Sequence, residues 1–478
     1  MIQRISLQTI FGCLFACLFV AQLGCSKDNS SGTLTPPPPP APVSESYEVF
    51  TKSYAKSYAK LPATTPPAKP LRLSRFFLVE QPSARISSTL LAAFKADPPG
   101  GLIFWNSASD DSSTLSETID LYSKALIDSG HLPAFFSIDY EGGGLRMAPS
   151  GLKIPGIQRF RDGFTDLAHG AWLGRSMAKY GTELCSLHGR IMGVELSAAG
   201  INFPLTLVSD LAQRLFLVRG VSTNPAQVAQ CLSAFTQAMA DAGPVVAVTK
   251  HYPGLGQNSG DTHDGESVST ARTLAESDRH LSPFRDLVSY VNQNGLESRL
   301  SIMSSHGKFP LLDPDHLTTE SSILLEDILR DRFQFRGVRV SDAMWMGEYG
   351  HLEGDALYAV YLNAFVSGLD LLMIPGGRYG GALRAFTQVA NNTATAGLKS
   401  AVAARSGLSF EKFREKFEAR TRESLERIDA TLKTLPYPHQ AMIRAIPRNL
   451  TSRERARYYE ILRSLDQRWL HELPAPVR

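Results

Sequence analysis

The stretch that decides the fold runs Val245-Val246-Ala247-Val248-Thr249-Lys250-His251-Tyr252-Pro253-Gly254-Leu255-Gly256-Gln257-Asn258-Ser259-Gly260-Asp261-Thr262-His263. A short apolar run, Val245–Val248, leads directly into a loop laced with Gly and Pro that holds a cation, two histidines and a carboxylate. In α/β enzymes, polar loops that follow buried strands carry the chemistry. The stretch therefore predicts an α/β enzyme with reactive groups at a strand end.

Outward from this strand, from about residue 72, short apolar runs alternate with longer amphipathic helices. The predicted strands are Arg75–Glu80, Gly101–Trp105, Ala134–Asp139, Ile201–Leu207, Val245–Lys250, Leu300–Ser305, Gly337–Asp342 and Leu369–Ile374. Eight such alternations predict one (β/α)8 TIM-type barrel over residues 71–400. The alternative is an open doubly wound sheet, but no Gly-rich phosphate loop follows the first strand.

Helix signals accompany these strands. Asn224-Pro225 and Ser282-Pro283 each place a capping side chain before a proline, which predicts a helix start at both sites. Residues 401–478 are rich in Arg, Glu and Lys, and Phe410, Phe413 and Phe417 have helical spacing. This segment predicts a charged helical extension packed on the barrel.

The N-terminal 25 residues resemble a bacterial lipoprotein signal peptide. Arg4 precedes the apolar run Ile10–Ala21, and the segment ends in Leu23-Gly24-Cys25. This pattern predicts cleavage before Cys25 and lipidation of its side chain, although Gln22 stands where such motifs usually carry an aliphatic residue. The alternative is an ordinary secretory peptide that is cut nearby.

Residues 26–70 are rich in Ser, Thr and Pro and include the run Pro36–Pro40. Such a segment cannot bury a core and predicts an extended tether between the membrane and the barrel. The expected location is the cell envelope, with a lipid anchor in the outer membrane and the body on its periplasmic or surface side. A monomer is expected.

Composition bears on two questions: whether the protein binds nucleic acid, and whether its cysteines are free or paired. The net charge of +3 is spread over the chain with no basic stripe, which argues against nucleic-acid binding. Besides Cys25, the mature chain keeps Cys185 and Cys231, both within helical patterns. Two buried free thiols are expected there rather than a disulfide.

Polar and titratable residues follow five of the predicted strands. In a barrel these strand ends meet on one rim, where active sites lie. The residues concerned are Asp139, the region Leu207–Asp210, Lys250-His251, His306 and Asp342. Their convergence predicts one polar site at the C-terminal end of the barrel.

Two of these motifs are suited to acid–base and nucleophilic chemistry. Asp342, at the end of an apolar strand, is interpreted as a nucleophile, a metal ligand or a structural cap. A metal is not expected, because the chain has no His-x-x-x-His motif or Cys pair. In Asp261-Thr262-His263 a carboxylate can raise the pKa of an imidazole and make it an acid near neutral pH. The alternative is a solvated surface loop.

Together these motifs resemble glycoside hydrolase family 3, in its single-domain bacterial β-N-acetylhexosaminidase branch, over about residues 72–400. The loop Lys250–His263 matches the family's loop at identical length, and Ile138-Asp139-Tyr140-Glu141-Gly142-Gly143 matches a second family motif. A third match is Gln334-Phe335-Arg336-Gly337-Val338-Arg339-Val340-Ser341-Asp342, with Gln334 in place of a glycine.

The resemblance implies a role for each matching residue. Asp342 corresponds to the nucleophile, and His263, partnered by Asp261, to the acid/base. The residues implied to bind or line the sugar site are Asp139, Arg219, Lys250, His251, His306 and Arg146, the last lying one position from a family arginine. No cofactor is implied.

The implied function is a retaining exo-β-N-acetylhexosaminidase that removes terminal N-acetylglucosamine from cell-wall-type glycans through a covalent glycosyl-Asp intermediate. Its expected substrate is an oligosaccharide or a muropeptide-type glycan. The alternatives are a broader exo-β-glycosidase of the same family and an inactive glycan-binding barrel. Leu255, Gln257, Gly144 and Ala343 depart from the family pattern, so the substrate preference is less firmly implied than the reaction class.

Overall fold

A closed ring of parallel strands forms the centre of the fold. The computed structural model describes residues 72–81, 88–104, 112–141, 169–216, 219–436 and 451–465. The ring strands are β1 (Phe77–Gln81), β2 (Gly101–Phe104), β3 (Phe135–Ile138), β4 (Leu205–Val208), β5 (Ala247–Tyr252), β8 (Leu300–Ser304), β11 (Arg339–Ser341) and β12 (Leu372–Ile374).

Two seams close this ring. Ladders of parallel hydrogen bonds join β12-β1-β2-β3 in one half and β11-β8-β5-β4 in the other. Parallel bridges from Asp139 to Leu205 and from Val340 to Leu371 then connect the two halves on both sides. The prediction of a (β/α)8 barrel is therefore confirmed, and all eight predicted strands are present among the described residues.

Apart from β5, which has the predicted length, the observed strands are shorter than the apolar runs that predicted them. Ahead of β4, for example, Ile201 and Phe203 are buried without pairing as strand residues. The side chain of Asn202 lies between them, accepts the Phe136 N–H at 2.8 Å and donates to the Ala134 carbonyl at 3.0 Å. The Asn202 amide thus adds to the backbone hydrogen bonds that Asn202 and Phe203 donate to the Phe136 carbonyl, a contact that apolar composition does not reveal.

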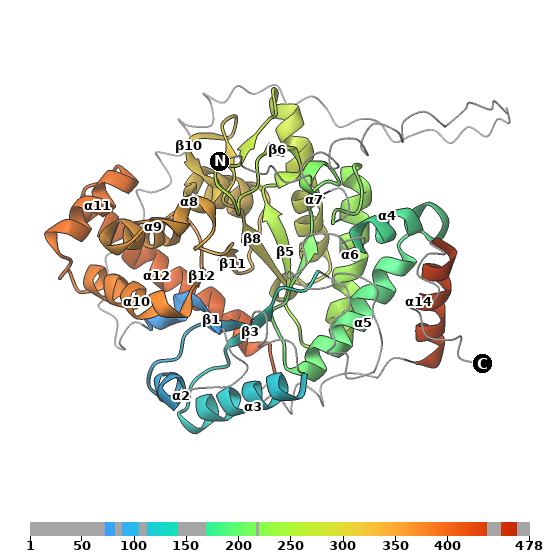
Figure 1. The fold of residues 1–478 in the computed structure, drawn as a ribbon, viewed down its shortest axis with the longest axis horizontal. Coiled ribbons are helices and arrows are strands. Elements are labelled where there is room, and N and C mark those ends of the chain that lie inside the picture. The colour runs from blue at the N-terminus through green and yellow to red at the C-terminus, as the bar shows by residue number, and fades with distance from the viewer. Residues whose placement is uncertain are drawn as a thin grey trace, which may run out of the picture. The chain divides into compact units, whose positions relative to one another are not determined.

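Helices follow the strands around the outside of the ring (Figure 1). The α-helices of the barrel are α2 (Ser88–Ala96), α3 (Ser112–Asp128), α4 (His169–Tyr180), α5 (Glu183–Ala199), α6 (Pro225–Ala242), α7 (Leu274–Gln293), α8 (Gly347–Gly350), α9 (Gly354–Val366) and α10 (Gly376–Ala390). Shorter or irregular turns are η1 (Leu73–Phe76), η3 (Arg214–Phe216), η4 (Leu255–Gln257), η5 (Glu297–Arg299), η6 (Thr318–Glu320) and the π-helical η7 (Ile323–Arg332). None of the helices in the described part is long and apolar enough to cross a bilayer.

One of the two predicted helix starts is confirmed and the other is wrong. Asn224 caps α6 by accepting the Ala226 N–H at 3.0 Å. Pro283, in contrast, lies inside α7, which begins after Thr273. Proline cannot donate to the carbonyl one turn earlier, and here the Ser282 hydroxyl donates to that Arg279 carbonyl at 3.0 Å. This substitution for the missing N–H lets the helix continue.

The expectation of two free thiols is also wrong, because Cys185 of α5 and Cys231 of α6 form a disulfide. The Cα atoms of the two cysteines lie 5.4 Å apart, within the range that a disulfide requires. Helical patterns around each cysteine were correct, but they do not show which faces of two helices meet.

Small residues bring α5 and α6 together in register. A Cβ added to Gly189 would lie 2.3 Å from the Phe235 carbonyl oxygen, and one added to Gly193 would lie 2.7 Å from that of Met239. Each of these pairs has the same sequence offset as the disulfide. The two helices therefore run in parallel with a constant register, and glycine is needed where their backbones approach most closely.

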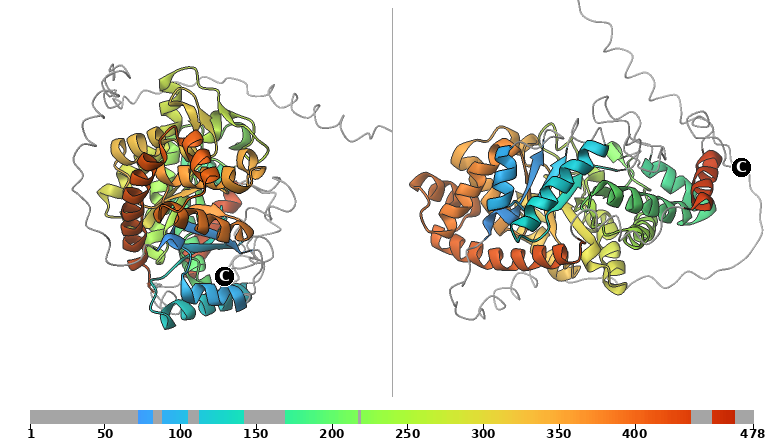
Figure 2. Two further views of the ribbon diagram at one scale, coloured as in Figure 1. Left: turned by 90° about the vertical axis from the view of Figure 1, so that its left-hand side faces the viewer. Right: turned by 90° about the horizontal axis from the view of Figure 1, so that it is seen from below.

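Helices of the C-terminal segment pack on the described barrel. They are α11 (Ala396–Ser406), α12 (Phe410–Lys433) and α14 (Ser452–Leu465), and α12 is the long helix along the outside of the barrel in Figure 2. Phe417 of α12 lies 5.4 Å from Phe365 of α9 and 5.5 Å from Phe386 of α10, measured between ring centroids. The hydroxyl of Tyr458, on α14, lies 3.1 Å from Nδ1 of His188 in α5.

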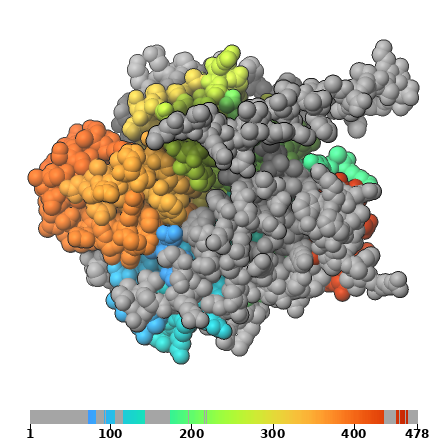
Figure 3. Space-filling model, viewed as in Figure 1, coloured from blue at the N-terminus to red at the C-terminus, as the bar shows by residue number. Residues whose placement is uncertain are grey.

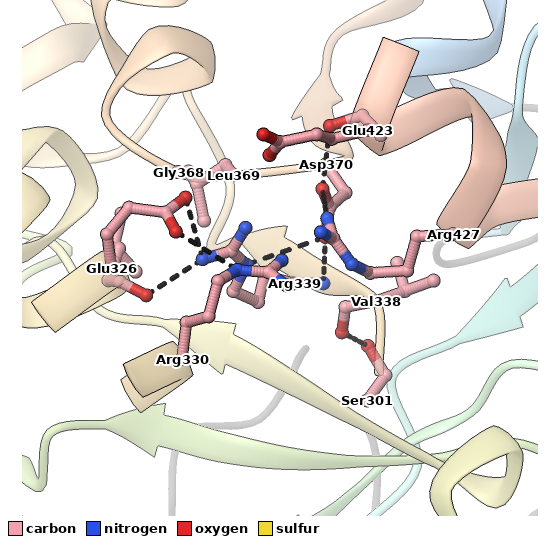
Figure 4. A network of polar contacts seen from close by, with 12 residues as sticks. Ser301, Glu326, Arg330, Val338, Arg339, Gly368, Leu369, Asp370, Glu423 and Arg427 are labelled. Carbon is pink, nitrogen blue, oxygen red and sulfur yellow. Dashed lines mark hydrogen bonds and ion pairs between the residues drawn. The ribbon is translucent and has the colours of Figure 1, made fainter. Parts of the chain in front are cut away.

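A buried network of charges joins α12 to the strands β11 and β12 (Figure 4). Its centre is Asp370, which is fully buried and accepts the Arg339 N–H at 2.9 Å. From α12, Arg420 donates to Asp370 at 3.1 Å, and Arg427 forms a further ion pair with it. Arg339 also lies 3.0 Å from Glu326 of η7. The helix α12 thus supplies two of the cations that compensate a carboxylate inside the barrel.

A small second sheet lies over one end of the ring. Its strands β6 (Asn258–Ser259), β7 (Val268–Ser269), β9 (Lys308–Phe309) and β10 (Asp313–Leu317) come from the segments after β5 and β8. Figure 3 shows these residues, in yellow-green and yellow, at the surface beside the orange residues of α8 to α11. The predicted signal peptide 1–25, with Cys25, and the predicted tether 26–70 lie outside the described residues.

Candidate active site

Two carboxylates and two cations meet where β3 and β5 end. The Lys250 ammonium lies 2.5 Å from Oδ1 of Asp139 and 2.8 Å from Oε1 of Glu141. Arg219 binds both oxygens of Glu141, with its Nε donating at 2.8 Å. Because Asp139 and Glu141 are two residues apart in extended backbone, both side chains project to the same side. The four charged groups compensate one another at the rim.

Burial and charge set the ionisation of this cluster. Burial raises the pKa of Glu141, but Arg219 and Lys250 outweigh it and hold that pKa well below its usual range. Burial raises the pKa of Asp139 above its ordinary value, and the charge of Glu141 adds to this effect. Burial lowers the pKa of Lys250, but Asp139 and Glu141 more than offset it, so the ammonium stays protonated.

His251 is held by the carboxylate of Asp210 at the end of β4. Its Nδ1 lies 2.7 Å from Oδ2 of Asp210, and its backbone N–H donates to the same oxygen at 3.0 Å. The other oxygen of Asp210 accepts the Leu255 N–H at 2.5 Å. Because a carboxylate accepts, Nδ1 of His251 carries a proton. Asp210 therefore sets both the orientation of His251 and the course of the following loop.

Asp342 lies half-buried directly after β11. Its N–H donates to the Ser304 carbonyl at 2.9 Å, and its Oδ1 accepts the Ala343 N–H at 2.8 Å. Burial raises the pKa of Asp342, but the charges of His251 and Lys250 and the Ala343 hydrogen bond lower it overall. The side chain is therefore an ionised carboxylate at neutral pH, as a nucleophile requires.

His263 and Asp261 form a hydrogen-bonded pair in the turn between β6 and β7. Nδ1 of His263 lies 2.7 Å from Oδ1 of Asp261, which also accepts the His263 N–H at 3.0 Å. The bond to Asp261 raises the pKa of His263, and the charge of Asp342 raises it further. The His263 carbonyl accepts the Gly347 N–H at 3.3 Å, so the turn lies beside the segment that follows Asp342. The imidazole is exposed, so it can exchange protons with solvent.

The turn that carries His263 is fixed by backbone pairing. Ser259 of β6 pairs with Val268 of β7, and Val268 pairs with Lys308 of β9. Gly260 lies between these strands with φ +81°, and a Cβ there would be 2.6 Å from the Glu266 carbonyl oxygen. The Gly-rich segment that carries His263 is thus a short hairpin joined to the segment after β8.

His306 lies at the rim but is bound on both ring nitrogens. Nε2 donates to the Ala343 carbonyl at 3.0 Å, and Nδ1 lies 2.7 Å from the Thr319 hydroxyl. Burial lowers the pKa of His306, so the ring is neutral at neutral pH. The side chain is 2% exposed. Its contacts are with the protein, close to Asp342.

The structure thus brings Asp139, Arg219, Lys250, His251 and His306 to the same end of the barrel as Asp342 and the Asp261–His263 pair. Arg146 and Gly144 lie outside the described residues. Leu255 and Gln257, the two departures within the loop, are both buried. No group of His, Cys, Asp or Glu able to hold a metal ion occurs among the described residues.

Glu141 and Asp210 are the two site residues to which the sequence assigned no role. The spacing of Asp139 and Glu141 could have revealed Glu141, since alternate residues of an extended segment share a face. Asp210 could have been found only as part of the strand-end region Leu207–Asp210. Its three hydrogen bonds are long-range in sequence and appear only in the folded chain.

Comparisons with known proteins identify the family of this chain. The model of the glycosyl hydrolase family 3 N terminal domain matches residues 77–403. The chain is 31% identical over 250 residues to a protein of Hydrogenovibrio crunogenus named Beta-hexosaminidase, a match that spans 51% of this chain and 64% of that protein. It is 30% identical over 327 residues to a protein of the same name from Aromatoleum aromaticum, across 66% of this chain and 81% of that one.

Solved structures share the fold. A family 3 β-N-acetylglucosaminidase from Paenibacillus sp. FPU-7 superposes with a TM-score of 0.61 at 23% identity, covering 82% of this chain and 67% of that one. A family 3 glycosyl hydrolase from Mycobacterium smegmatis superposes with a TM-score of 0.58 at 22% identity, covering 78% and 99%. With the match of the family model, these findings confirm the predicted family: the chain belongs to glycosyl hydrolase family 3, a family of glycoside hydrolases.

Proposed function

We propose that this protein is a retaining exo-β-N-acetylhexosaminidase that removes terminal N-acetylglucosamine from cell-wall-type glycans. The observation that supports this most directly is that the Asp261–His263 pair lies on a turn whose His263 carbonyl accepts the Gly347 N–H at 3.3 Å, beside the segment that follows Asp342. The pKa of Asp342 is lowered and that of His263 is raised. One group is thereby a nucleophile and the other an acid at the same pH. The relatives named Beta-hexosaminidase support the choice of substrate class.

In the first step Asp342 attacks the anomeric carbon of the terminal sugar. His263 gives its proton to the glycosidic oxygen, so that the leaving alcohol departs neutral, and a glycosyl–Asp342 ester forms. In the second step the neutral His263 takes a proton from water, which attacks the same carbon and releases Asp342. Two inversions leave the configuration of the sugar retained.

The charged cluster at the ends of β3 and β5 would bind the hydroxyl groups of the sugar. Asp139 and Glu141 can accept hydrogen bonds, and Lys250 and Arg219 can donate them. His251, with Nδ1 held by Asp210, would form a hydrogen bond to a sugar hydroxyl through Nε2. Because these groups already hold one another in place, they bind the sugar with little reorganisation as positive charge develops in the transition state.

A panel of aryl β-glycosides tests the reaction and its residues. We expect wild-type protein to hydrolyse the N-acetyl-β-glucosaminide faster than the β-glucoside. Asp342→Asn should lower kcat by about 10³-fold or more, because the nucleophile is lost. His263→Ala should lower it by about 10²-fold on substrates with poor leaving groups. Faster hydrolysis of the glucoside would favour the broader exo-β-glycosidase, and tight glycan binding without turnover would favour an inactive barrel.

His316→Ala is the matched control for the acid. His316 is an exposed imidazole whose Nδ1 lies 3.2 Å from Asp313, like the Asp261–His263 pair, but it lies on β10, at the opposite edge of the small sheet from β6. We expect this variant to keep wild-type kcat. An equal loss in His263→Ala and His316→Ala would contradict the assignment of His263.

We further propose that the protein works in the cell envelope, held by a lipid on Cys25. The disulfide between Cys185 and Cys231 supports a site outside the reducing cytoplasm, because structural disulfides persist in oxidising compartments. Membrane fractions should contain wild-type protein, and Cys25→Ser should move it to a soluble fraction. Recovery of the wild-type chain from the cytosol with reduced cysteines would contradict this location.

A further inference from the structure

A series of polar contacts leads from Arg405, near the end of α11 and just beyond the part of the chain that the family model matches, into the interior of the protein. There Arg405 donates to both oxygens of Glu320, with Nε at 2.7 Å and Nη2 at 2.5 Å. Glu320 lies in η6 and is 4% exposed. Its oxygens also accept the Tyr349 hydroxyl and the Asn363 side-chain amide, each at 3.0 Å. Four donors from three elements thus fix one buried carboxylate.

The contacts continue from Tyr349 to His306. The two rings meet edge to face, with centroids 4.8 Å apart and planes at 80°. The Thr319 hydroxyl, on the residue before Glu320, lies 2.7 Å from Nδ1 of His306. A shift of Glu320 would therefore affect the position of the His306 ring by two routes: through the ring of Tyr349 and through the backbone that joins Glu320 to Thr319.

From His306 the contacts reach Ala343, the residue that follows the proposed nucleophile Asp342. Nε2 of His306 donates to the Ala343 carbonyl, and the Ala343 N–H donates to Oδ1 of Asp342 at 2.8 Å. Both polar groups of Ala343 are therefore engaged. The Ala343 N–H and carbonyl belong to successive peptide groups that share one Cα atom, so the hydrogen bond from His306 helps to fix the residue whose N–H orients the Asp342 carboxylate.

We infer that Arg405, Glu320, Tyr349 and His306 form a positioning chain that fixes the orientation of Asp342, with Arg405 supplied by the C-terminal segment. This inference rests on the proposed role of Asp342 as nucleophile. A nucleophile displaced by a fraction of an ångström loses rate without losing substrate binding. The positioning chain should therefore affect kcat more than KM.

Tyr349→Phe and Arg405→Met test the positioning chain in the full-length protein. The first removes one hydroxyl and keeps the ring against His306, and the second removes the cation and keeps an aliphatic side chain. We expect kcat on an aryl N-acetyl-β-glucosaminide to fall about 10-fold in each, with KM within about twofold. The acid limb of kcat/KM should move to higher pH, because the Ala343 hydrogen bond lowers the pKa of Asp342.

Matched variants separate positioning from a general loss of stability. Arg414→Met removes an α12 arginine that pairs with Glu418 one turn away, and it should leave kcat and the pH profile unchanged. Arg405→Lys keeps the charge but not the two-pronged contact, and it should restore part of kcat. Because both variants act through Glu320, Tyr349→Phe combined with Arg405→Met should lose less than the product of the single losses.

Each outcome is informative. Folded Tyr349→Phe and Arg405→Met proteins with wild-type kcat and an unmoved acid limb would overturn the positioning chain while leaving the proposed function intact. Should Arg405→Met not fold, Tyr349→Phe decides alone, because it deletes a single oxygen. Wild-type protein without glycosidase activity would instead overturn the proposed function.

Discussion

The proposed roles of His263 as an acid and Asp342 as a nucleophile require opposite charges, and the surroundings of the two side chains move their pKa values in opposite directions. The bond to Asp261 raises the pKa of His263, while the charge of His251 and the Ala343 N–H help to keep the pKa of the buried Asp342 below its ordinary value. Between the two pKa values the imidazole is protonated and the carboxylate is ionised. The hydrogen bond to Asp261 is the largest of the effects that set the upper limit of this interval.

Asp261→Asn should therefore narrow the pH range of activity. The imidazole must be protonated to act as an acid, so the rate falls as pH rises through the pKa of His263. Removing the carboxylate that raises this pKa moves the basic limb of kcat/KM to lower pH and leaves the acid limb unchanged. The pH profile on a substrate with a poor leaving group measures this shift. A basic limb at the wild-type position would mean that Asp261 does not control His263.

Among the elements, α5 and α6 depend on close backbone approach as well as on their disulfide. Gly189 faces the Phe235 carbonyl at a distance that leaves no room for a methyl group. Overpacking of this kind typically costs about 1–3 kcal/mol. We expect Gly189→Ala to lower the free energy of unfolding by that amount, measured by urea denaturation with the disulfide intact.

Gly377→Ala is the control for this substitution. Gly377 is also helical, in α10, but a Cβ there meets nothing within 4 Å. Alanine should change the free energy of unfolding by less than about 1 kcal/mol, in the stabilising direction. Equal losses in the two variants would show that helix propensity, and not the approach of α5 to α6, determines the cost.

The elements were easier to predict than the contacts between them. Period and composition predicted eight strands and the start of α6, because these signals are local. The Cys185–Cys231 bond depends on which helix faces meet, and the spacing of Cys185, Gly189 and Gly193 on one helical face was the only local sign of it. The helix start predicted at Ser282-Pro283 was wrong because the Ser282 hydroxyl donates to the Arg279 carbonyl, to which a proline has no N–H to donate.

In the candidate site, too, the sequence predicted the positions of residues better than the contacts between them. Asp342, Lys250, His251 and Asp139 were predicted from their positions at strand ends, and the resemblance to a family assigned their roles. The bonds of Glu141 to Arg219 and of His306 to Ala343 join residues far apart in sequence. Such partners are decided by side-chain geometry in the folded state, which motif spacing does not contain.

At the scale of the whole described molecule, the charge network around Asp370 makes α12 part of the barrel. Asp370 is fully buried and pairs with Arg420 and Arg427 of α12. Asp370→Asn would leave buried guanidinium groups without their counter-charge, at a cost of about 3–5 kcal/mol. Glu423→Gln, which changes an exposed carboxylate bound to the same Arg420, should cost less than about 1 kcal/mol.

The same network predicts how stability depends on pH. Burial raises the pKa of Asp370, but Arg427 and Arg339 outweigh it and hold that pKa far below its unfolded value of about 3.9. A depressed pKa contributes stability that is present above about pH 4 and is lost as pH falls further. Urea midpoints measured from neutral pH downward should therefore fall below about pH 4 less steeply in Asp370→Asn than in wild type. Parallel curves would show that Asp370 does not link folding to pH.

The closed ring has a consequence for how neighbouring copies behave. A strand at an open sheet edge can pair with another chain, and the eight ring strands have no such edge. The small sheet does have edges, but β6 is only two residues long. On β10, Pro314 has no N–H, and the next two N–H groups both donate to Oδ1 of Asp313. When several molecules lie close together on a surface, the described sheets thus offer few unpaired backbone groups to which a strand of a neighbouring molecule could bind.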